Sequence, residues 1–139
     1  RHKGTHHIGL GYIQGYGLKS GAVATSISHD SHNIIVVGTN SADMAFAANY
    51  IVEHHGGIVV VENGEICGNV VLEIAGIMSD CPLTEMNEKL EGAKAAAFKL
   101  GVKEGIDPFM TLSFMALPVI PKLRITTRGV VDVDTQQYV

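Results

Sequence analysis

Apolar residues recur at helical spacing in two stretches of the chain. In the first stretch they occupy positions i, i+3, i+4 and i+7. This stretch begins after a capping residue, Asn40 or Ser41, and ends at the Gly56-Gly57 pair, whereas the second runs from Pro82 to Gly101. The apolar positions are Met44, Ala47, Ala48 and Ile51 in the first, and Leu83, Met86, Leu90, Ala93, Ala97 and Leu100 in the second. The spacing predicts two long amphipathic helices, each with one face to bury against a sheet.

Period-2 and β-branched patterns predict strands around these helices. Residues 22–28 alternate bulky and small side chains, which predicts a strand whose small face lies under a closely packed neighbour. Residues 34–37 are continuously apolar, which is typical of a strand covered on both faces. Asn63-Gly64 between residues 58–62 and 65–67 is a strong hairpin signal because both turn positions favour positive φ.

The last third of the chain is less regular. Residues 107–121 are apolar but contain three prolines, so the pattern leaves a strand and a short helix both open. Residues 123–126 and 130–133 predict a final hairpin. Two hairpins without regular strand–helix alternation predict an α+β fold, a mainly antiparallel sheet with the two long helices packed on it, as one domain over residues 1–139.

Composition narrows the classes of function. Of the 139 residues, 46% are hydrophobic and 17% charged, and the net charge is −4 without a run of Lys and Arg, so no nucleic-acid partner is expected. No apolar run is long enough to span a bilayer and no secretory leader pattern is seen, so we expect no membrane partner and a cytoplasmic location. Cys67 and Cys81 are expected to be free thiols.

Two further segments could be functional sites, but each also has an ordinary structural explanation. The glycines of residues 8–18 suggest a phosphate-binding loop, but the required flanking strand and helix are missing, so bulges or close backbone approach in a strand are favoured. His54 and His55 could bind a metal, although imidazoles at a helix C-terminus complement the helix dipole.

Residues 28–33, read SHDSHN, concentrate polar chemistry between two predicted strands. His29, Asp30 and His32 have the ligand types for Zn, Mn or Fe, yet His-x-x-His in extended chain places its side chains on opposite faces. Asp30 could instead orient an imidazole for acid–base work, with no nucleophile motif nearby. The third alternative is a turn whose side chains, including Ser31 and Asn33, satisfy their own backbone.

Two long motifs, residues 28–40 (SHDSHNIIVVGTN) and 107–121 (DPFMTLSFMALPVIP), are joined by matches at residues 8–18 and 74–80. With these motifs the chain resembles, over nearly its whole length, the C-terminal domain of bacterial and archaeal adenine deaminases. The resemblance implies a parent enzyme of the amidohydrolase superfamily that hydrolyses adenine to hypoxanthine and ammonia in purine salvage, with Mn or Fe in a (β/α)₈ barrel activating water.

That barrel needs at least about 200 residues, and the chain has no His-x-His pair of the kind the family places on its first barrel strand. The resemblance therefore implies no metal, cofactor or assignable catalytic residue here, and a chain that begins at Arg1 is expected to be part of a longer polypeptide and inactive alone. Its partners would be the barrel of the same polypeptide, adenine as the parent's substrate, and a second copy in a homo-oligomer.

The resemblance also suggests roles for two sets of residues. His29, Asp30, Ser31, His32 and Asn33 are expected to face the barrel's mouth, where they could contact the purine edge, shield the pocket or fix the interface. The second set either forms an apolar docking surface or belongs to the core; its members are Phe109, Met110 and Phe114. The alternative function is a free-standing purine-binding, ligand-binding or protein-interaction module without catalysis.

Overall fold

A computed structural model describes residues 7–139 of the chain. Its centre is a four-stranded sheet of order β2-β1-β3-β4, in which every neighbouring pair is antiparallel. The strands are β1 (Ala22–Thr25), β2 (Ile35–Gly38), β3 (Gly57–Glu62) and β4 (Glu65–Val71). The α+β class predicted from the sequence, with a mainly antiparallel sheet, is confirmed.

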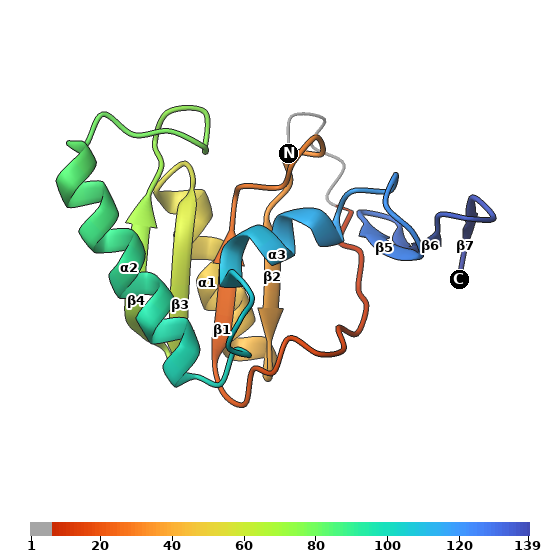
Figure 1. Ribbon diagram of the computed structural model, residues 1–139, viewed down its shortest axis with the longest axis horizontal. Coiled ribbons are helices and arrows are strands. Elements are labelled where there is room, and N and C mark those ends of the chain that lie inside the picture. The colour runs from red at the N-terminus through yellow and green to blue at the C-terminus, as the bar shows by residue number, and fades with distance from the viewer. Residues whose placement is uncertain (1–6) are drawn as a thin grey trace.

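Helices cover both faces of this sheet (Figure 1). Helix α1 (Ser41–Glu53) packs on one face, while α2 (Leu83–Lys99) and the shorter α3 (Pro108–Met115) pack on the other. The small face of β1, Ala22 and Ala24, lies in the core cluster with α1, and Val23 belongs to the opposite cluster. The predicted close packing over the small face is therefore confirmed, because alanine side chains let the helix approach the strand.

Local capping explains where the helices begin. The Asn40 side chain accepts a hydrogen bond from the Asp43 N–H at 2.8 Å, as the predicted N-cap should. Asp107 accepts from the N–H groups of Phe109 and Met110 at 3.0 and 2.9 Å, with Pro108 in the first turn. The ambiguous segment 107–121 thus starts as a helix, since proline is favoured at that first position.

The β3–β4 hairpin forms at Asn63-Gly64, with φ values of 53° and 77°. The buried carboxylate of Asp43 accepts from the N–H groups of Gly64 at 2.8 Å and Asn63 at 3.2 Å. The Asn40 side-chain amide donates to the same carboxylate at 2.8 Å. These hydrogen bonds tie the start of α1 to the hairpin turn and hold the pKa of the Asp43 carboxyl below its usual value, the Asn40 bond contributing most.

A second sheet of order β5-β6-β7 lies at one side of the domain (Figure 1). It contains the predicted hairpin, β5 (Leu123–Thr126) and β6 (Gly129–Asp132), and a short strand that the sequence did not predict, β7 (Gln137–Tyr138). Within residues 7–139 no helix has the length and apolar character needed to cross a bilayer.

Some predicted strand boundaries are wrong. The strand expected at residues 22–28 ends at Thr25. The packing on both faces expected for residues 34–37 is confirmed, because Ile35 and Val37 pack against one core cluster and Ile34 and Val36 against the other, although β2 is an edge strand and only half-buried. The described residues of segment 8–18 form no strand. The predicted close approach is confirmed at Gly9, where a β-carbon would overlap the Thr126 carbonyl oxygen of β5.

Candidate functional site

The SHDSHN residues form a tight loop between β1 and β2. The Ser31 N–H donates to the Ser28 carbonyl at 3.0 Å, and the two serine hydroxyls are hydrogen-bonded at 2.5 Å. Ser28 is 1% exposed, so this pair is anchored at the sheet. His29 and His32 have φ values of 37° and 50°, in the left-handed region that residues other than glycine adopt infrequently and that histidine tolerates better than most. The Ser31 hydroxyl also lies 3.1 Å from the Ser28 carbonyl oxygen, so Ser31 bonds the loop's own backbone in the way that the turn alternative describes.

His29 and Asp30 form an exposed pair at the tip of this loop. The His29 Nδ1 lies 2.9 Å from a carboxylate oxygen of Asp30. A carboxylate only accepts, so Nδ1–H donates and leaves Nε2 of the neutral ring as an acceptor. This is the geometry of an imidazole oriented by a carboxylate, one of the alternatives drawn from the sequence.

His32 and Asn33 do not join this pair. His32 is exposed and Asn33 half-buried, and neither side chain has a hydrogen bond within residues 7–139. In the same part of the chain, no group of three or more His, Cys, Asp and Glu side chains could hold a metal ion. The loop therefore offers hydrogen-bonding side chains but does not fit a Mn or Fe centre.

The three candidate docking residues separate in the structure. Phe109 is only 3% exposed and belongs to the main core, so it offers no surface to a partner. Met110 and Phe114 are 44% and 38% exposed. The Phe114 and His29 rings lie 5.7 Å apart, which brings the end of α3 against the SHDSHN loop. Two sets of candidates far apart in sequence thus share one surface.

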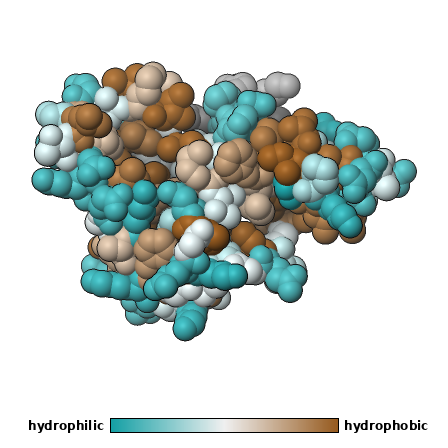
Figure 2. Space-filling model, viewed as in Figure 1, coloured by the Kyte–Doolittle hydropathy of each residue, from teal (hydrophilic) through white to brown (hydrophobic). Residues whose placement is uncertain are grey.

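An apolar loop that was not singled out as a site lies at the same end of the sheet. Ile74, Ile77 and Met78 follow β4 and are 42–53% exposed. Figure 2 shows hydrophobic residues gathered over this loop and, separately, beside α3 and β5. The buried Ser26 hydroxyl fastens the loop by donating to the Gly76 carbonyl at 2.5 Å. In the sequence, the signal for this exposed loop is the presence of apolar residues between turn residues in segment 74–80.

The His54-His55 pair has a structural role at the end of α1. The His54 ring stacks on Tyr50, with centroids 4.0 Å apart, and its Nδ1 lies 2.9 Å from the Tyr50 carbonyl oxygen. The same carbonyl also accepts from the His54 backbone N–H at 3.1 Å, so the ring N–H adds a second hydrogen bond at the negative end of the helix. The helix-terminus explanation drawn from the sequence therefore holds for His54.

Comparison with known proteins agrees with the resemblance drawn from the sequence. A family model described as the adenine deaminase C-terminal domain matches residues 1–137. An adenine deaminase of Petrotoga mobilis is 52% identical over 139 residues, and one of Bacillus subtilis is 48% identical over the same length. Each match covers 100% of this chain but 24% of the relative. The chain belongs to the family of adenine deaminase C-terminal domains.

Proposed function

We propose that this chain works as the C-terminal domain of an adenine deaminase that hydrolyses adenine to hypoxanthine and ammonia. The family match over residues 1–137 carries this proposal, and the exposed His29–Asp30 pair beside the partly exposed Phe114 ring is the feature of the structure that fits it. The catalytic residues and the Mn or Fe ion belong to an amidohydrolase barrel in the remaining part of a longer, cytoplasmic polypeptide. This chain alone is inactive and completes the rim of the active site.

The upper end of the sheet, where β1 and β4 finish and β2 and β3 begin, is suited to docking. It carries polar chemistry on the SHDSHN loop and two separate groups of exposed apolar side chains. One group is Met110 and Phe114 on α3, with Phe114 beside His29, and the other is Ile74, Ile77 and Met78 in the loop after β4. Exposed apolar residues gathered near one another are typical of an interaction surface, whereas isolated ones need no explanation. The relatives are about four times as long as this chain, and their remaining residues are the proposed occupant.

The His29–Asp30 pair has a definite chemical use in such an interface. Asp30 holds Nδ1–H, so Nε2 of His29 is the atom left for a purine edge or for a proton. The Phe114 ring lies beside the His29 ring, with centroids 5.7 Å apart and planes tilted by 41°. Closing this end against a second domain would lower the local dielectric and strengthen every hydrogen bond made inside it.

The test compares loop variants in the full-length enzyme. We expect His29→Ala to lower kcat/KM for adenine by at least about tenfold, the effect of losing one hydrogen bond to a reacting or bound group. Asp30→Asn removes the carboxylate that orients the ring and should lower kcat/KM less. The matched control is Asp134→Asn, an exposed position in the β6–β7 turn, which should leave kcat/KM unchanged.

Two results would overturn the proposal. One is unchanged turnover and unchanged affinity for adenine in His29→Ala and Asp30→Asn enzymes whose melting temperatures equal that of the parent. The other is ammonia release from adenine by the purified 139-residue chain above a blank containing Mn or Fe alone. An intact mass must exclude contaminating full-length enzyme in that second assay.

A further inference from the structure

Within residues 7–139, the outer edge of β2 presents unpaired backbone groups. The Thr39 N–H donates to the Gly21 carbonyl at 2.9 Å, and the register continues through Val23↔Val37. Hydrogen-bonding direction alternates along an antiparallel strand, so the N–H and C=O of Val36 and Gly38 point away from β1. No strand within residues 7–139 pairs with that edge. Two backbone donors and two acceptors therefore remain available there.

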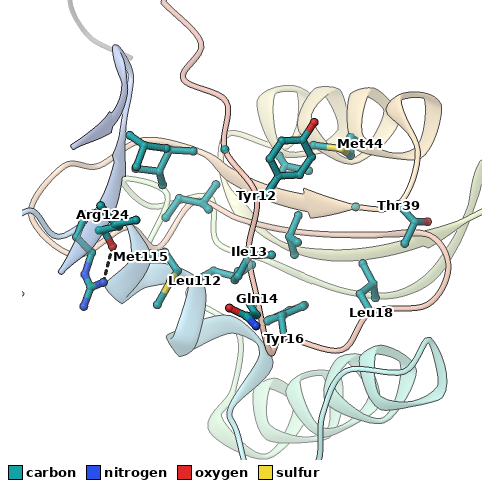
Figure 3. Close-up of a pocket in the computed structure, with 18 of the residues that line it drawn as sticks. Tyr12, Ile13, Gln14, Tyr16, Leu18, Thr39, Met44, Leu112, Met115 and Arg124 are labelled. Atoms are coloured by element: carbon teal, nitrogen blue, oxygen red, sulfur yellow. Dashed lines mark hydrogen bonds between the residues drawn. The ribbon is translucent and has the colours of Figure 1, made fainter. Parts of the chain in front are cut away.

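A strap, residues 9–18, passes beside this edge and is held at both ends. At its start, Gly9 lies against β5, as described above. At its other end, the Tyr16 hydroxyl donates to the Pro108 carbonyl at 2.9 Å and the Tyr16 carbonyl accepts from the Lys103 N–H at 2.9 Å. The middle of the strap thus crosses the edge of β2 without pairing with it (Figure 3).

The strap, β2, α3 and the β5–β6 hairpin enclose a hollow of about 450 Å³. Its volume lies within the ordinary range of small-molecule sites. Most of its lining is apolar, including Ile13 from the strap, Leu112 from α3 and Met44 from α1. The β2 edge supplies the backbone polar groups, and Gln14 and Thr39 supply side-chain ones (Figure 3).

Charge and hydrogen bonding limit what this hollow can bind. Among the described residues its lining contains no carboxylate and one cation, Arg124, whose Nη atoms donate to the Leu123 and Pro121 carbonyls. The Arg124 Nε is buried without a partner within residues 7–139. A neutral ligand with a flat apolar face and a polar edge therefore suits the hollow better than a cation.

The outward groups of β2 match the edge of a 6-aminopurine. Moving along the edge, the Val36 carbonyl is an acceptor and the Gly38 N–H the next donor. Adenine carries an exocyclic amino donor beside a ring-nitrogen acceptor on one edge, which is the complementary pair. Its flat faces would lie between the apolar side chains of the strap and α3.

We propose that this hollow is a binding site for adenine or a closely related 6-aminopurine, formed entirely by residues of this chain, with the base hydrogen-bonded edge-on to β2. The choice of a purine rests on the proposed function, whereas the site itself rests on the open edge and the hollow. Because the ligand would contact this chain alone, binding does not require the catalytic barrel.

The test is a titration of the 139-residue chain with adenine, followed by amide proton–nitrogen correlation spectra. We expect saturable binding with a dissociation constant of about 0.1–1 mM, and the largest shifts at the Gly38 amide and along the strap. N6,N6-dimethyladenine lacks the amino donor and should bind about tenfold more weakly. Gln14→Trp fills the hollow and should weaken adenine binding at least about tenfold, while Gln137→Trp, on exposed β7, should not.

The same titration can refute the site. Absence of shifts at adenine concentrations well above about 1 mM would overturn it. Shifts confined to the SHDSHN loop would also overturn it, while supporting a purine contact at the rim. Full-length kinetics of the His29 and Asp30 variants are independent of both outcomes, so failure here is distinguishable from failure of the proposed function.

Discussion

Replacing Ser26 by alanine removes a hydroxyl that joins three segments at the upper end of the sheet. Ser26 directly follows β1 and is 2% exposed. Its Oγ accepts from the Gly57 N–H at 2.8 Å and donates to the Gly76 carbonyl at 2.5 Å. Both glycines are buried. Alanine therefore leaves one N–H and one C=O without this partner, in a place where water has little access.

The expected magnitude follows from those two groups. Leaving one buried backbone group unsatisfied costs about 1–3 kcal/mol, so the variant should lose about 3 kcal/mol of unfolding free energy. At a urea dependence of about 2 kcal/mol per M, the unfolding midpoint should fall by about 1.5 M with an unchanged slope. Ser20→Ala is the matched control, because the Ser20 hydroxyl donates to Glu62 at 2.6 Å where both residues are half-buried.

Water can replace the lost bond at Ser20, so that variant should lose at most about 1 kcal/mol. If urea titrations of the two variants give equal losses, the reasoning from buried unsatisfied groups fails. A second readout is hydrogen exchange at Ile77 and Met78, whose N–H groups donate to the Ile74 carbonyl. Both amides should exchange faster in Ser26→Ala, since the loop after β4 loses its fastening to β1.

Two further predictions concern single side chains. The pKa of Asp43 is lowered in the folded state, so its contribution to stability is present above its unfolded pKa of about 3.9 and is lost as pH falls. In urea titrations at pH 7, Asp43→Asn should therefore be less stable than the parent. A difference in unfolding free energy between the two that does not shrink below about pH 4 would contradict this assignment. Phe109→Ala should lower the unfolding free energy by about 3–5 kcal/mol and Phe114→Ala by less than about 2 kcal/mol, because Phe109 is 3% and Phe114 38% exposed. Equal losses of stability in thermal or urea unfolding would contradict the assignment of Phe109 to the core and Phe114 to the surface.

The elements with strong local signals were predictable from sequence. Helix α1 combines a side-chain cap at Asn40 with apolar spacing, and the β3–β4 turn needs positive φ at Asn63 and Gly64. Both signals act within a few residues, so tertiary structure has only to agree with them. Helix α2 begins at Leu83 as the pattern predicts, but placing Leu83 on the buried apolar face is wrong, because its side chain is 85% exposed.

Features that depend on tertiary contacts were harder to predict from the sequence. Phe109 and Met110 are neighbours of similar hydrophobicity, and only the position of α3 against the sheet decides that Phe109 is buried and Met110 exposed. Strand β2 is covered on both faces, as its β-branched residues indicate, yet it is only half-buried because the strand order places it at the edge of the sheet. Strand order depends on long-range pairing, which the local pattern does not contain.

The candidate site was predictable in composition but not in geometry. Residue types alone left metal binding, acid–base chemistry and turn formation open for the SHDSHN loop. The structure separates these uses among neighbours: Ser28 and Ser31 make the turn, and His29 pairs with Asp30. The contact between His29 and Phe114 could not be foreseen, because it joins a loop to a helix from a distant part of the chain.

The two ends of the sheet have different roles: the lower end stabilises the fold, and the upper end also supports the proposed interaction surface. At the lower end, Asp43 ties α1 to the β3–β4 turn with bonds that are entirely internal. At the upper end, Ser26 holds the loops from beneath while His29, Phe114 and Met78 remain exposed above them. A substitution at Asp43 should therefore change stability alone. One at Ser26 should change stability and also displace the surface proposed to complete the active site, so stability and turnover should fall together only at the upper end.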